Sequence, residues 1–277
     1  MLLLLARSTG LVLVHGNGPQ VGMILLRVED SEDRLPRESL DMLVAETQGS
    51  VGVLLSRALR NALVAEGSWL EVTTLMTQVV VDPDDPAFER PEKPIGPHYS
   101  EERARQLHRE RGWYMVLEAG RGWRRAVPSP RPLRVVEMSS IAAAARAGRV
   151  VIAGGGGGVP VRDDGAAGLS GVEAVIDKDR TAALIATSLA AGTFCMLTGV
   201  PHVLSDFGSP DEQRIPRMTV DEARGRLKAG EFPPGSMGPK IEAAADYVER
   251  TRREALITDA AHLAPALEGD EGTRIVP

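Results

Sequence analysis

The stretch Leu11-Val-Leu-Val-His-Gly-Asn-Gly18 joins a short apolar run to a loop that contains glycine. Later in the chain, Val150-Val-Ile-Ala-Gly-Gly-Gly-Gly157 repeats the same order of residue types. Each stretch predicts a buried strand followed by a loop whose backbone amides can closely approach an anion or a small planar substrate. A tight turn alone would explain either loop. However, the five consecutive glycines at residues 154–158 exceed what one turn requires, so the second loop favours a function.

Apolar runs alternate with helix-like segments, so the sequence predicts an α/β fold with a largely parallel sheet. Residues 82–98 are rich in Pro and Asp and end the first series of elements. Residues 100–132 are expected to form a small excursion from the main sheet. We expect helices from Pro19, at 40–66, 100–111 and 141–147, and after Lys178 and Lys240. We expect strands at 11–14, 72–81, 114–118, 123–127, 150–153, 193–197, 255–258 and 273–276.

The composition is that of an ordinary soluble globular protein, with 277 residues of which 43% are hydrophobic and 25% charged. The formal net charge of -6 argues against a broad surface for nucleic acid. The single Cys195 lies in an apolar run, which favours a buried core thiol and suits a reducing cytoplasm. Residues 1–6 are too short for a signal sequence, and no apolar run approaches the ~20 residues that span a bilayer. We therefore expect a cytoplasmic protein with neither membrane nor nucleic-acid partners.

Two lysines occupy unfavourable places. Lys178 ends Gly171-Val-Glu-Ala-Val-Ile-Asp-Lys178 and Lys240 ends Gly235-Ser-Met-Gly-Pro-Lys240, and each opens a stretch that reads as helix. A cation in the first turn of a helix opposes the helix dipole, unless an anion is held there by the lysine and the helix-end amides together. A solvated lysine beside a capping aspartate is the alternative for Lys178. Together with the glycine loops, the lysines favour phosphoryl chemistry, in which Asp179 orients the lysines.

Two rival nucleotide motifs fail. Gly16, Gly18 and Gly22 have one residue too many for the G-x-G-x-x-G fingerprint, and the sequence before Lys240 is not a Walker A motif. The basic stretch at residues 120–125 is either a solvated edge strand or a hairpin that brings an arginine over an anionic substrate. The histidines have no metal-ligand spacing, so no metal site is expected in the protein.

In its motifs the chain resembles the carbamate kinases of the amino acid kinase superfamily. The matching stretches follow one another in the order found in that family. They are His15-Gly-Asn-Gly-Pro-Gln-Val-Gly22, Thr77-Gln-Val-Val-Val-Asp-Pro83, Lys93-Pro-Ile-Gly-Pro97, Ala119-Gly-Arg-Gly-Trp-Arg124, Val127-Pro-Ser-Pro130 and residues 154–161, 171–179 and 235–244.

The resemblance implies a three-layer αβα sandwich on an eight-stranded, mostly parallel central sheet, usually in a homodimer. It implies an N-terminal, carbamate-side lobe at residues 1–81, a small protruding subdomain at 82–133 and a nucleotide-binding lobe at 134–277. The implied activity is reversible phosphoryl transfer between ATP and carbamate, giving ADP and carbamoyl phosphate. In the family this reaction often serves arginine catabolism by the deiminase route. Mg²⁺ would bind through the nucleotide phosphates.

Site residues follow from the matching motifs. The resemblance assigns catalysis to Lys178, Asp179 and Lys240. Substrate binding falls to Gly16, Asn17, Gly18, Arg125, Gly155, Gly156 and Gly157. Nucleotide binding falls to Lys178, Thr198, Met237 and Lys240.

The chain departs from the family pattern in several places. Family members begin with a strand, a Gly-Gly-Asn loop and a helix, whereas residues 1–10 match only the end of that helix. A start codon placed too far downstream is the favoured explanation, beside a truncated gene or a descendant that has lost catalysis. Arg125 replaces a frequent Lys, which keeps the charge but changes its geometry. Pro201 replaces a usual Asp and Phe207 a common Tyr, and both changes concern contacts to the adenine.

Two other functions stay open. The chain could be a catalytically impaired protein that binds a nucleotide or carbamoyl phosphate, because the first family loop is missing. It could also be another kinase of the superfamily that acts on an amino acid carboxylate, although the carbamate-specific motifs argue against this.

Overall fold

The computed structural model describes residues 10–233 and 235–277. The chain divides into two compact units. Among the described residues, the N-terminal unit extends to Thr181, and the C-terminal unit begins at Ala182 and extends to Pro277. The boundary falls inside helix α6 (Lys178–Ser188), just after its first turn. The expected match of residues 1–10 to the end of a family helix lies almost wholly outside the described residues.

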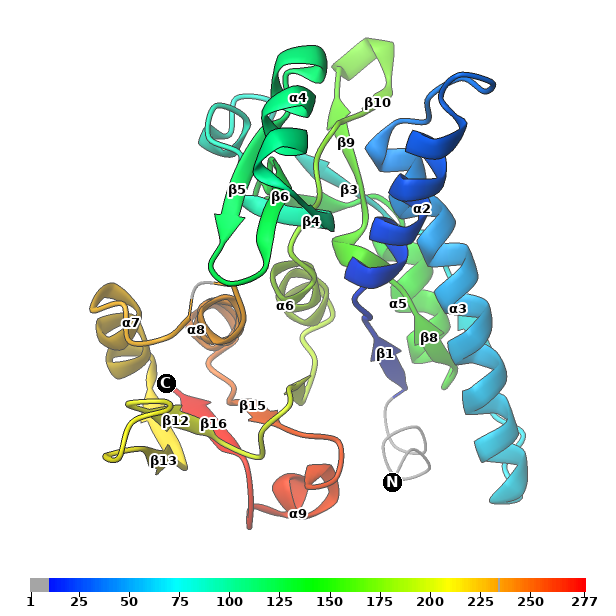
Figure 1. Cartoon of the computed structure of the whole chain (residues 1–277). Coiled ribbons are helices and arrows are strands. Elements are labelled where there is room, and N and C mark those ends of the chain that lie inside the picture. Colours follow the sequence, from blue (N-terminus) through cyan, green and yellow to red (C-terminus); the bar gives the residue numbers. More distant parts are fainter. Residues whose placement is uncertain (1–9, 234) are drawn as a thin grey trace. The chain divides into compact units, whose positions relative to one another are not determined.

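A parallel sheet in the N-terminal unit places the two glycine loops beside each other. Its order is β1-β8-β2, in which Leu11 and Val72 both pair with Val150. Because parallel strands end at the same edge of a sheet, the loops after β1 and β8 emerge together. The three strands are β1 (Leu11–Leu13), β8 (Val150–Ile152) and β2 (Val72–Thr74). The helices associated with this part of the unit are α2 (Gly18–Ser31), α3 (Leu40–Ala65) and α5 (Met138–Arg146), and α2 and α3 run side by side (Figure 1).

A second sheet of the N-terminal unit has the order β10-β9-β3-β7. Only β3 and β9 pair in parallel. The strand expected at residues 72–81 is therefore two strands, because the chain leaves the first sheet after Thr74 and enters the second at Gln78. The strands are β10 (Leu169–Gly171), β9 (Val159–Asp163), β3 (Gln78–Val81) and β7 (Pro132–Val135).

The expected excursion forms an antiparallel sheet of its own, with the order β4-β6-β5. Helix α4 (Glu101–Arg111) packs on it, capped by the Ser100 hydroxyl and ended by Gly112 in the left-handed region (Figure 1). Strand β4 (Lys93–Tyr99) was not expected in a Pro- and Asp-rich segment. It pairs with β6 from Lys93 to Ile95 and again at Tyr99, and its second proline, Pro97, falls in the irregular part between them, where a missing N–H is tolerated. The other two strands are β5 (Tyr114–Glu118) and β6 (Gly122–Val127).

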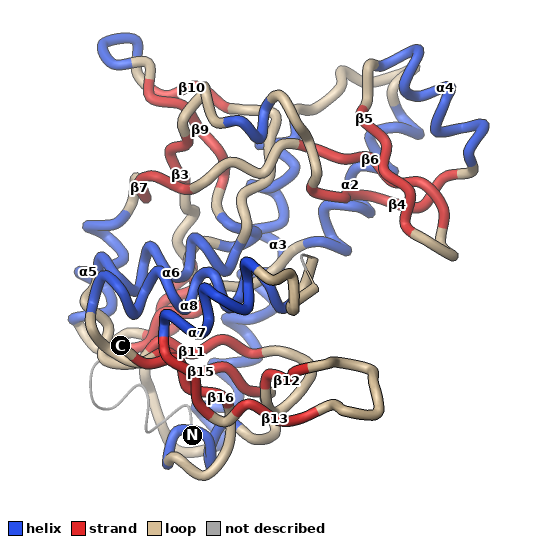
Figure 2. Tube along the Cα trace, turned by 90° about the vertical axis from the view of Figure 1, so that its left-hand side faces the viewer, coloured by secondary structure: helices blue, strands red, loops and turns tan. Residues whose placement is uncertain are grey.

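The C-terminal unit is a second α/β layer structure with the sheet order β11-β15-β16-β14 (Figure 2). Its core surrounds Tyr247, whose ring lies 5.0 Å from that of Phe194 and whose hydroxyl donates to Ala191 O. The sheet strands are β11 (Phe194–Leu197), β15 (Ala255–Thr258), β16 (Thr273–Val276) and β14 (Arg217–Thr219). A hairpin, β12 (Val203–Ser205) with β13 (Gln213–Ile215), and helices α7 (Val220–Lys228), α8 (Met237–Thr251) and α9 (Leu263–Glu268) complete it.

The α/β fold class predicted from the sequence is confirmed. Within the described residues the strands form several short sheets rather than one ladder of eight. Strands after residue 134, such as β8 and β9, pair with strands before residue 82, so the N-terminal unit extends to Thr181. The three-part division at residues 82 and 134 stays a prediction. None of the helices in the described part of the chain has both the length and the apolar character that crossing a bilayer requires.

Candidate active site

The two glycine loops are hydrogen-bonded to each other in the N-terminal unit. Gly156 N donates to His15 O at 2.8 Å. The Asn17 amide lies so close to Gly156 that a Cβ there would sit 2.1 Å from Asn17 Nδ2. Gly156 also has a φ of +66°, which favours glycine. The uninterrupted glycines are therefore required both by backbone conformation and by the approach of the first loop.

A buried side chain, Gln48, fixes the second loop from behind. Its Nε2 donates to Gly155 O at 3.0 Å and to Thr77 O at 3.1 Å, and its Oε1 accepts from Thr77 N at 2.8 Å. The Thr77 hydroxyl in turn accepts from Gly154 N at 2.9 Å. Buried polar groups that are fully paired in this way hold a backbone in one conformation. The loop is thus a preorganised structure rather than a loose linker.

Thr47, beside Gln48 on helix α3, orients Asn17. The Thr47 hydroxyl donates to Val44 O at 2.7 Å, so its lone pair accepts from Asn17 Nδ2 at 2.8 Å. The amide nitrogen of Asn17 is consequently turned toward Thr47, which leaves the amide oxygen as the group available for a hydrogen-bond donor.

Lys178 lies against the first loop. It is the first residue of α6 and is exposed, and a Cβ on Gly16 would meet its Cδ at 3.3 Å and its Nζ at 3.6 Å. The helix start is tied to the second loop, because the Thr181 hydroxyl donates to Gly157 O at 2.7 Å. The structure therefore brings together Lys178 and both glycine loops, which are distant in the sequence.

Asp177 and Asp179 are both buried beside Lys178. Asp177 Oδ1 accepts from Asp179 N at 2.9 Å, and Asp177 Oδ2 lies 2.8 Å from Lys93 Nζ on β4. Burial by itself would raise the pKa of the Asp177 carboxyl, but the charge and hydrogen bond of Lys93 outweigh it and hold that pKa below its ordinary value. Asp177 is therefore a carboxylate at neutral pH, and it anchors the start of α6 to the β4-β6-β5 sheet.

Arg125 occupies a different part of the N-terminal unit. Its guanidinium lies 4.3 Å above the ring of Trp113 and 3.3 Å from Glu173 Oε2. Glu173 Oε1 accepts from Leu40 N at the start of α3. Burial lowers the pKa of Arg125 from its usual value, and the Glu173 charge opposes that shift. The substrate-binding role expected for Arg125 stays a prediction.

The remaining predicted residues lie in the C-terminal unit. Lys240 is buried in the first turn of α8. The helix begins at Met237, after Ser236 at the N-cap position, and not at the lysine. Met237 packs against the unit's core. Thr198 N donates to Thr258 O at 2.8 Å, at the ends of β11 and β15. Their nucleotide roles stay predictions. Burial raises the pKa of the half-buried Cys195 thiol to about 11, which disfavours the thiolate form at neutral pH.

Sequence reasoning missed the residues that hold the loops in place, namely Thr47, Gln48, Thr77, Lys93, Glu173 and Thr181. One signal was present for Gln48. Leu40, Val44 and Gln48 follow one another at four-residue spacing, which places this amide on the buried face of α3. Over residues 10–233 and 235–277, no group of three or more His, Cys, Asp or Glu side chains is arranged to hold a metal ion.

Comparisons with known proteins place the chain in a family. The profile of the amino acid kinase family matches residues 2–259. The carbamate kinase of Thermococcus kodakarensis is 44% identical over 96% of this chain and 84% of its own length. The carbamate kinase of Trichomonas vaginalis is 45% identical over 96% of this chain and 86% of its own.

A solved structure agrees with the sequence relatives. Carbamate kinase from Giardia lamblia, bound to AMP-PNP, superposes with a TM-score of 0.90 at 36% identity, covering 99% of this chain and 86% of that one. The chain therefore belongs to the amino acid kinase family, and the carbamate kinases are the members of that family that it resembles.

Proposed function

We propose that the chain catalyses reversible phosphoryl transfer between ATP and carbamate, giving ADP and carbamoyl phosphate. The observation that carries this proposal is the packing of Lys178 against Gly16, in a loop that is hydrogen-bonded to the second glycine loop. One ammonium and the amides of the first loop suit the anionic groups of carbamate and of a transferring phosphoryl group. Most amides of the second loop donate within the protein and hold the two loops together. The similarity to carbamate kinases supports the same reaction.

Phosphoryl transfer to carbamate depends more on positioning and charge neutralisation than on a general base. Carbamate is already an anion, so its oxygen can attack the terminal phosphorus without losing a proton. Lys178 would offset charge on the transferring group, and the amides of the first glycine loop would hold the oxygens in line. Asp177 and Asp179 would keep the start of α6, and with it Lys178, in position. Asn17 would offer its amide oxygen to the amino group of carbamate.

Thr198, Met237 and Lys240 of the C-terminal unit would hold ATP or ADP in this proposal. Mg²⁺ would arrive with the nucleotide and neutralise its phosphates. A relative bound to AMP-PNP supports the nucleotide as substrate. Arginine breakdown is the proposed pathway, in which the enzyme would run toward ATP, and the cytoplasm is the proposed location.

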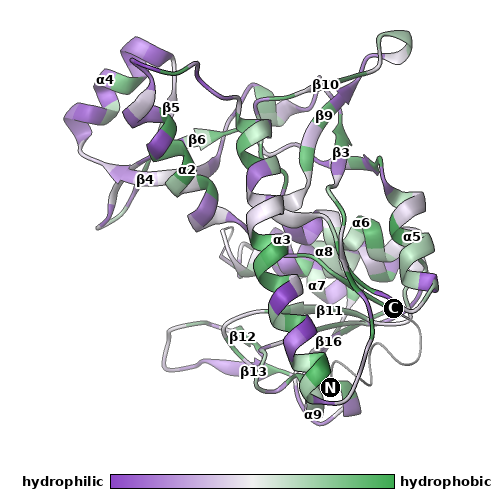
Figure 3. Cartoon of the chain, turned by 90° about the vertical axis from the view of Figure 1, so that its right-hand side faces the viewer, coloured by the Kyte–Doolittle hydropathy of each residue, from purple (hydrophilic) through white to green (hydrophobic). Residues whose placement is uncertain are grey.

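A homodimer is the proposed assembly. Helix α3 exposes Val53 and Leu54, at 54% and 62% of their surface, and apolar residues alternate with polar ones along this helix (Figure 3). Exposed large apolar side chains on one helix suit a protein interface. Light scattering would measure the mass in solution, and a monomer at micromolar concentration would contradict the dimer.

The test of the reaction is ATP formation by the purified chain from ADP, Mg²⁺ and carbamoyl phosphate. Lys178→Ala should lower turnover by roughly a hundredfold or more, as expected for loss of a charge that stabilises the transition state. Lys228→Ala, which removes an exposed lysine of α7, is the matched control and should leave turnover unchanged.

Other outcomes separate the alternatives. ADP binding by the folded wild-type chain without turnover would indicate an impaired binding protein. Turnover of an amino acid carboxylate in place of carbamate would indicate another kinase of the superfamily. Full activity in Lys178→Ala would overturn the role given to this lysine.

A further inference from the structure

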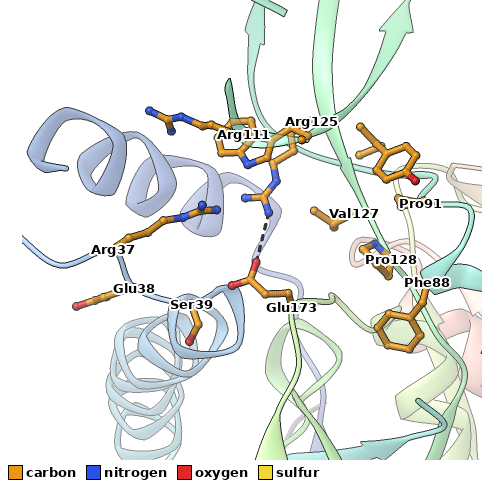
Figure 4. A pocket seen from close by; sticks show the side chains of 14 residues that line it. Arg37, Glu38, Ser39, Phe88, Pro91, Arg111, Arg125, Val127, Pro128 and Glu173 are labelled. Carbon is orange, nitrogen blue, oxygen red and sulfur yellow. Dashed lines mark hydrogen bonds and ion pairs between the residues drawn. The ribbon is translucent and has the colours of Figure 1, made fainter. Parts of the chain in front are cut away.

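A pocket of about 530 Å³ lies in the N-terminal unit around Trp113 and Arg125. Its walls come from the segment before α3, the end of α4, strand β6 and Glu173 (Figure 4). Its volume is in the range of sites that take small molecules. The residues of the two glycine loops are not among those that line it.

Three arginines surround the single indole ring of Trp113. The guanidinium carbons of Arg125, Arg111 and Arg37 lie 4.3, 5.1 and 5.7 Å from the ring centre. Contact with an aromatic face stabilises each cation, but it leaves the N–H donors at the edge of the guanidinium free for other partners. The ring therefore holds three positive charges close together, and its contacts do not use the N–H donors of the guanidinium groups.

Several carboxylates lie near these arginines, and most of them have other partners. Glu29 acts on Arg125 through its charge, but its Oε1 accepts from the Tyr99 hydroxyl. Arg111 is paired with Glu32. Glu173 meets Arg125 at 3.3 Å through one oxygen, while its other oxygen accepts from Leu40 N. Glu38 also lines the pocket, but its carboxylate points away from Arg125 in Figure 4.

Of the three arginines around Trp113, Arg37 is the one without a carboxylate partner among the described residues. Its guanidinium reaches toward the same space as that of Arg125 (Figure 4). Among residues 10–233 and 235–277, no carboxylate lies within ion-pair distance of it. Its like charge also lowers the pKa of Arg125, after the larger effect of burial. Arg37 and Arg125 thus line one open pocket in which Glu173 is paired with Arg125 alone, an arrangement that an added anion would stabilise.

We propose that this pocket binds a small molecule carrying two or more anionic groups, carboxylates or phosphates, through Arg37 and Arg125 over Trp113. Arginine forks bind either kind of group in a bidentate manner. The residues of the glycine loops do not line this pocket, and in this proposal Arg125 serves the added anion rather than the carbamate assigned to it from the sequence.

Isothermal titration calorimetry tests the proposal, with tricarballylate as a tricarboxylate probe and inorganic phosphate as a second, separate probe. Saturating ADP without Mg²⁺ is present, so that phosphate sites of the nucleotide are filled. The wild-type chain should bind at least one probe, and Arg37→Ala should bind it about tenfold or more weakly. Arg34→Ala removes the same charge from an exposed position in the same segment and should bind like wild type.

The two probes distinguish the source of the anion. Binding of tricarballylate alone indicates a polycarboxylate, and binding of phosphate that depends on Arg37 indicates a phosphorylated ligand. The proposal is overturned if neither probe binds the folded wild-type chain at millimolar concentration. It is equally overturned if Arg37→Ala binds both probes as wild type does, because the anion would then lie elsewhere.

Discussion

The ammonium of Lys93 lies 2.8 Å from Oδ2 of Asp177, which joins the first strand of the β4-β6-β5 sheet to the residue before Lys178. The same carboxylate caps the start of α6 by accepting from Asp179 N. The buried Asp177 carboxylate thus contacts both the β4-β6-β5 sheet and the helix that carries the proposed catalytic lysine. A movement of that sheet would therefore displace the start of α6.

Lys93→Met should misplace Lys178 and destabilise the chain. It leaves a buried carboxylate without its cation, and we expect a loss of about 1–2 kcal/mol in unfolding free energy, since Lys93 is itself partly exposed. Turnover should fall roughly tenfold or more, because catalysis depends on position. Urea denaturation and ATP formation measure the two effects, with Lys228→Met as control. Unchanged turnover would show that the ion pair does not position Lys178.

The effect of Lys93→Met should depend on pH. The folded-state pKa of Asp177 lies below its ordinary value of 3.8, so the ion pair contributes stability above about pH 4, and this contribution is lost as the pH falls through the folded pKa. The difference in unfolding free energy between wild type and variant should therefore be largest near neutral pH and shrink in acid. A difference that grows on acidification would contradict the assigned carboxylate.

Gln48→Ala should loosen the second glycine loop. The variant leaves Thr77 N, Thr77 O and Gly155 O without their buried partner, so we expect a loss of about 2–4 kcal/mol in unfolding free energy. Gln106→Ala on the surface of α4 is the matched control and should cost less than about 1 kcal/mol. Chemical denaturation checks both. Equal stability of the two variants would mean that the loop holds its shape without Gln48.

Gly156→Ala and Gly165→Ala separate backbone strain from the contact with Asn17. Both glycines have a positive φ, +66° at Gly156 and +63° at Gly165, so both variants should lose roughly 1–2 kcal/mol from backbone strain. Only at Gly156 would the new Cβ strike Asn17, since nothing lies within 4 Å at Gly165. Turnover should fall sharply in Gly156→Ala alone. Similar activity in both variants would argue against a role for the Asn17 position.

Thr258→Val and Thr273→Val test two fully buried hydroxyls on neighbouring strands of the C-terminal unit. Thr273 Oγ1 accepts from Val203 N at 2.8 Å and donates to Ile215 O, so its loss should cost about 2–3 kcal/mol. Thr258 Oγ1 has no hydrogen-bond partner among the described residues, so Thr258→Val should be neutral or stabilising. Denaturation midpoints compare the two. Equal losses would contradict the difference in pairing.

Local sequence patterns determined much of this protein. Apolar runs such as residues 150–153 could only be buried strands, and the prolines, glycines and caps around them set where most helices begin and end. The failures were also local. No strand was expected at Lys93–Tyr99, which contains two prolines, yet this segment pairs with β6 as a strand. The short helices α7 and α9 were not expected either, because their periodic signal is weak.

The two glycine loops and Lys178 were identified by residue type and spacing, because only glycine fits a left-handed backbone against a neighbouring loop and because a cation at a helix start is unusual. What holds them was decided by tertiary structure alone. Gln48 reaches Gly155 across 107 residues, and Lys93 reaches Asp177 across 84. The same is true of Arg37, Arg111 and Arg125, which meet on one indole ring. A hydrogen bond or ion pair between distant residues leaves no periodic trace in the sequence, because it depends on which strands pair and not on the order of neighbours along the chain.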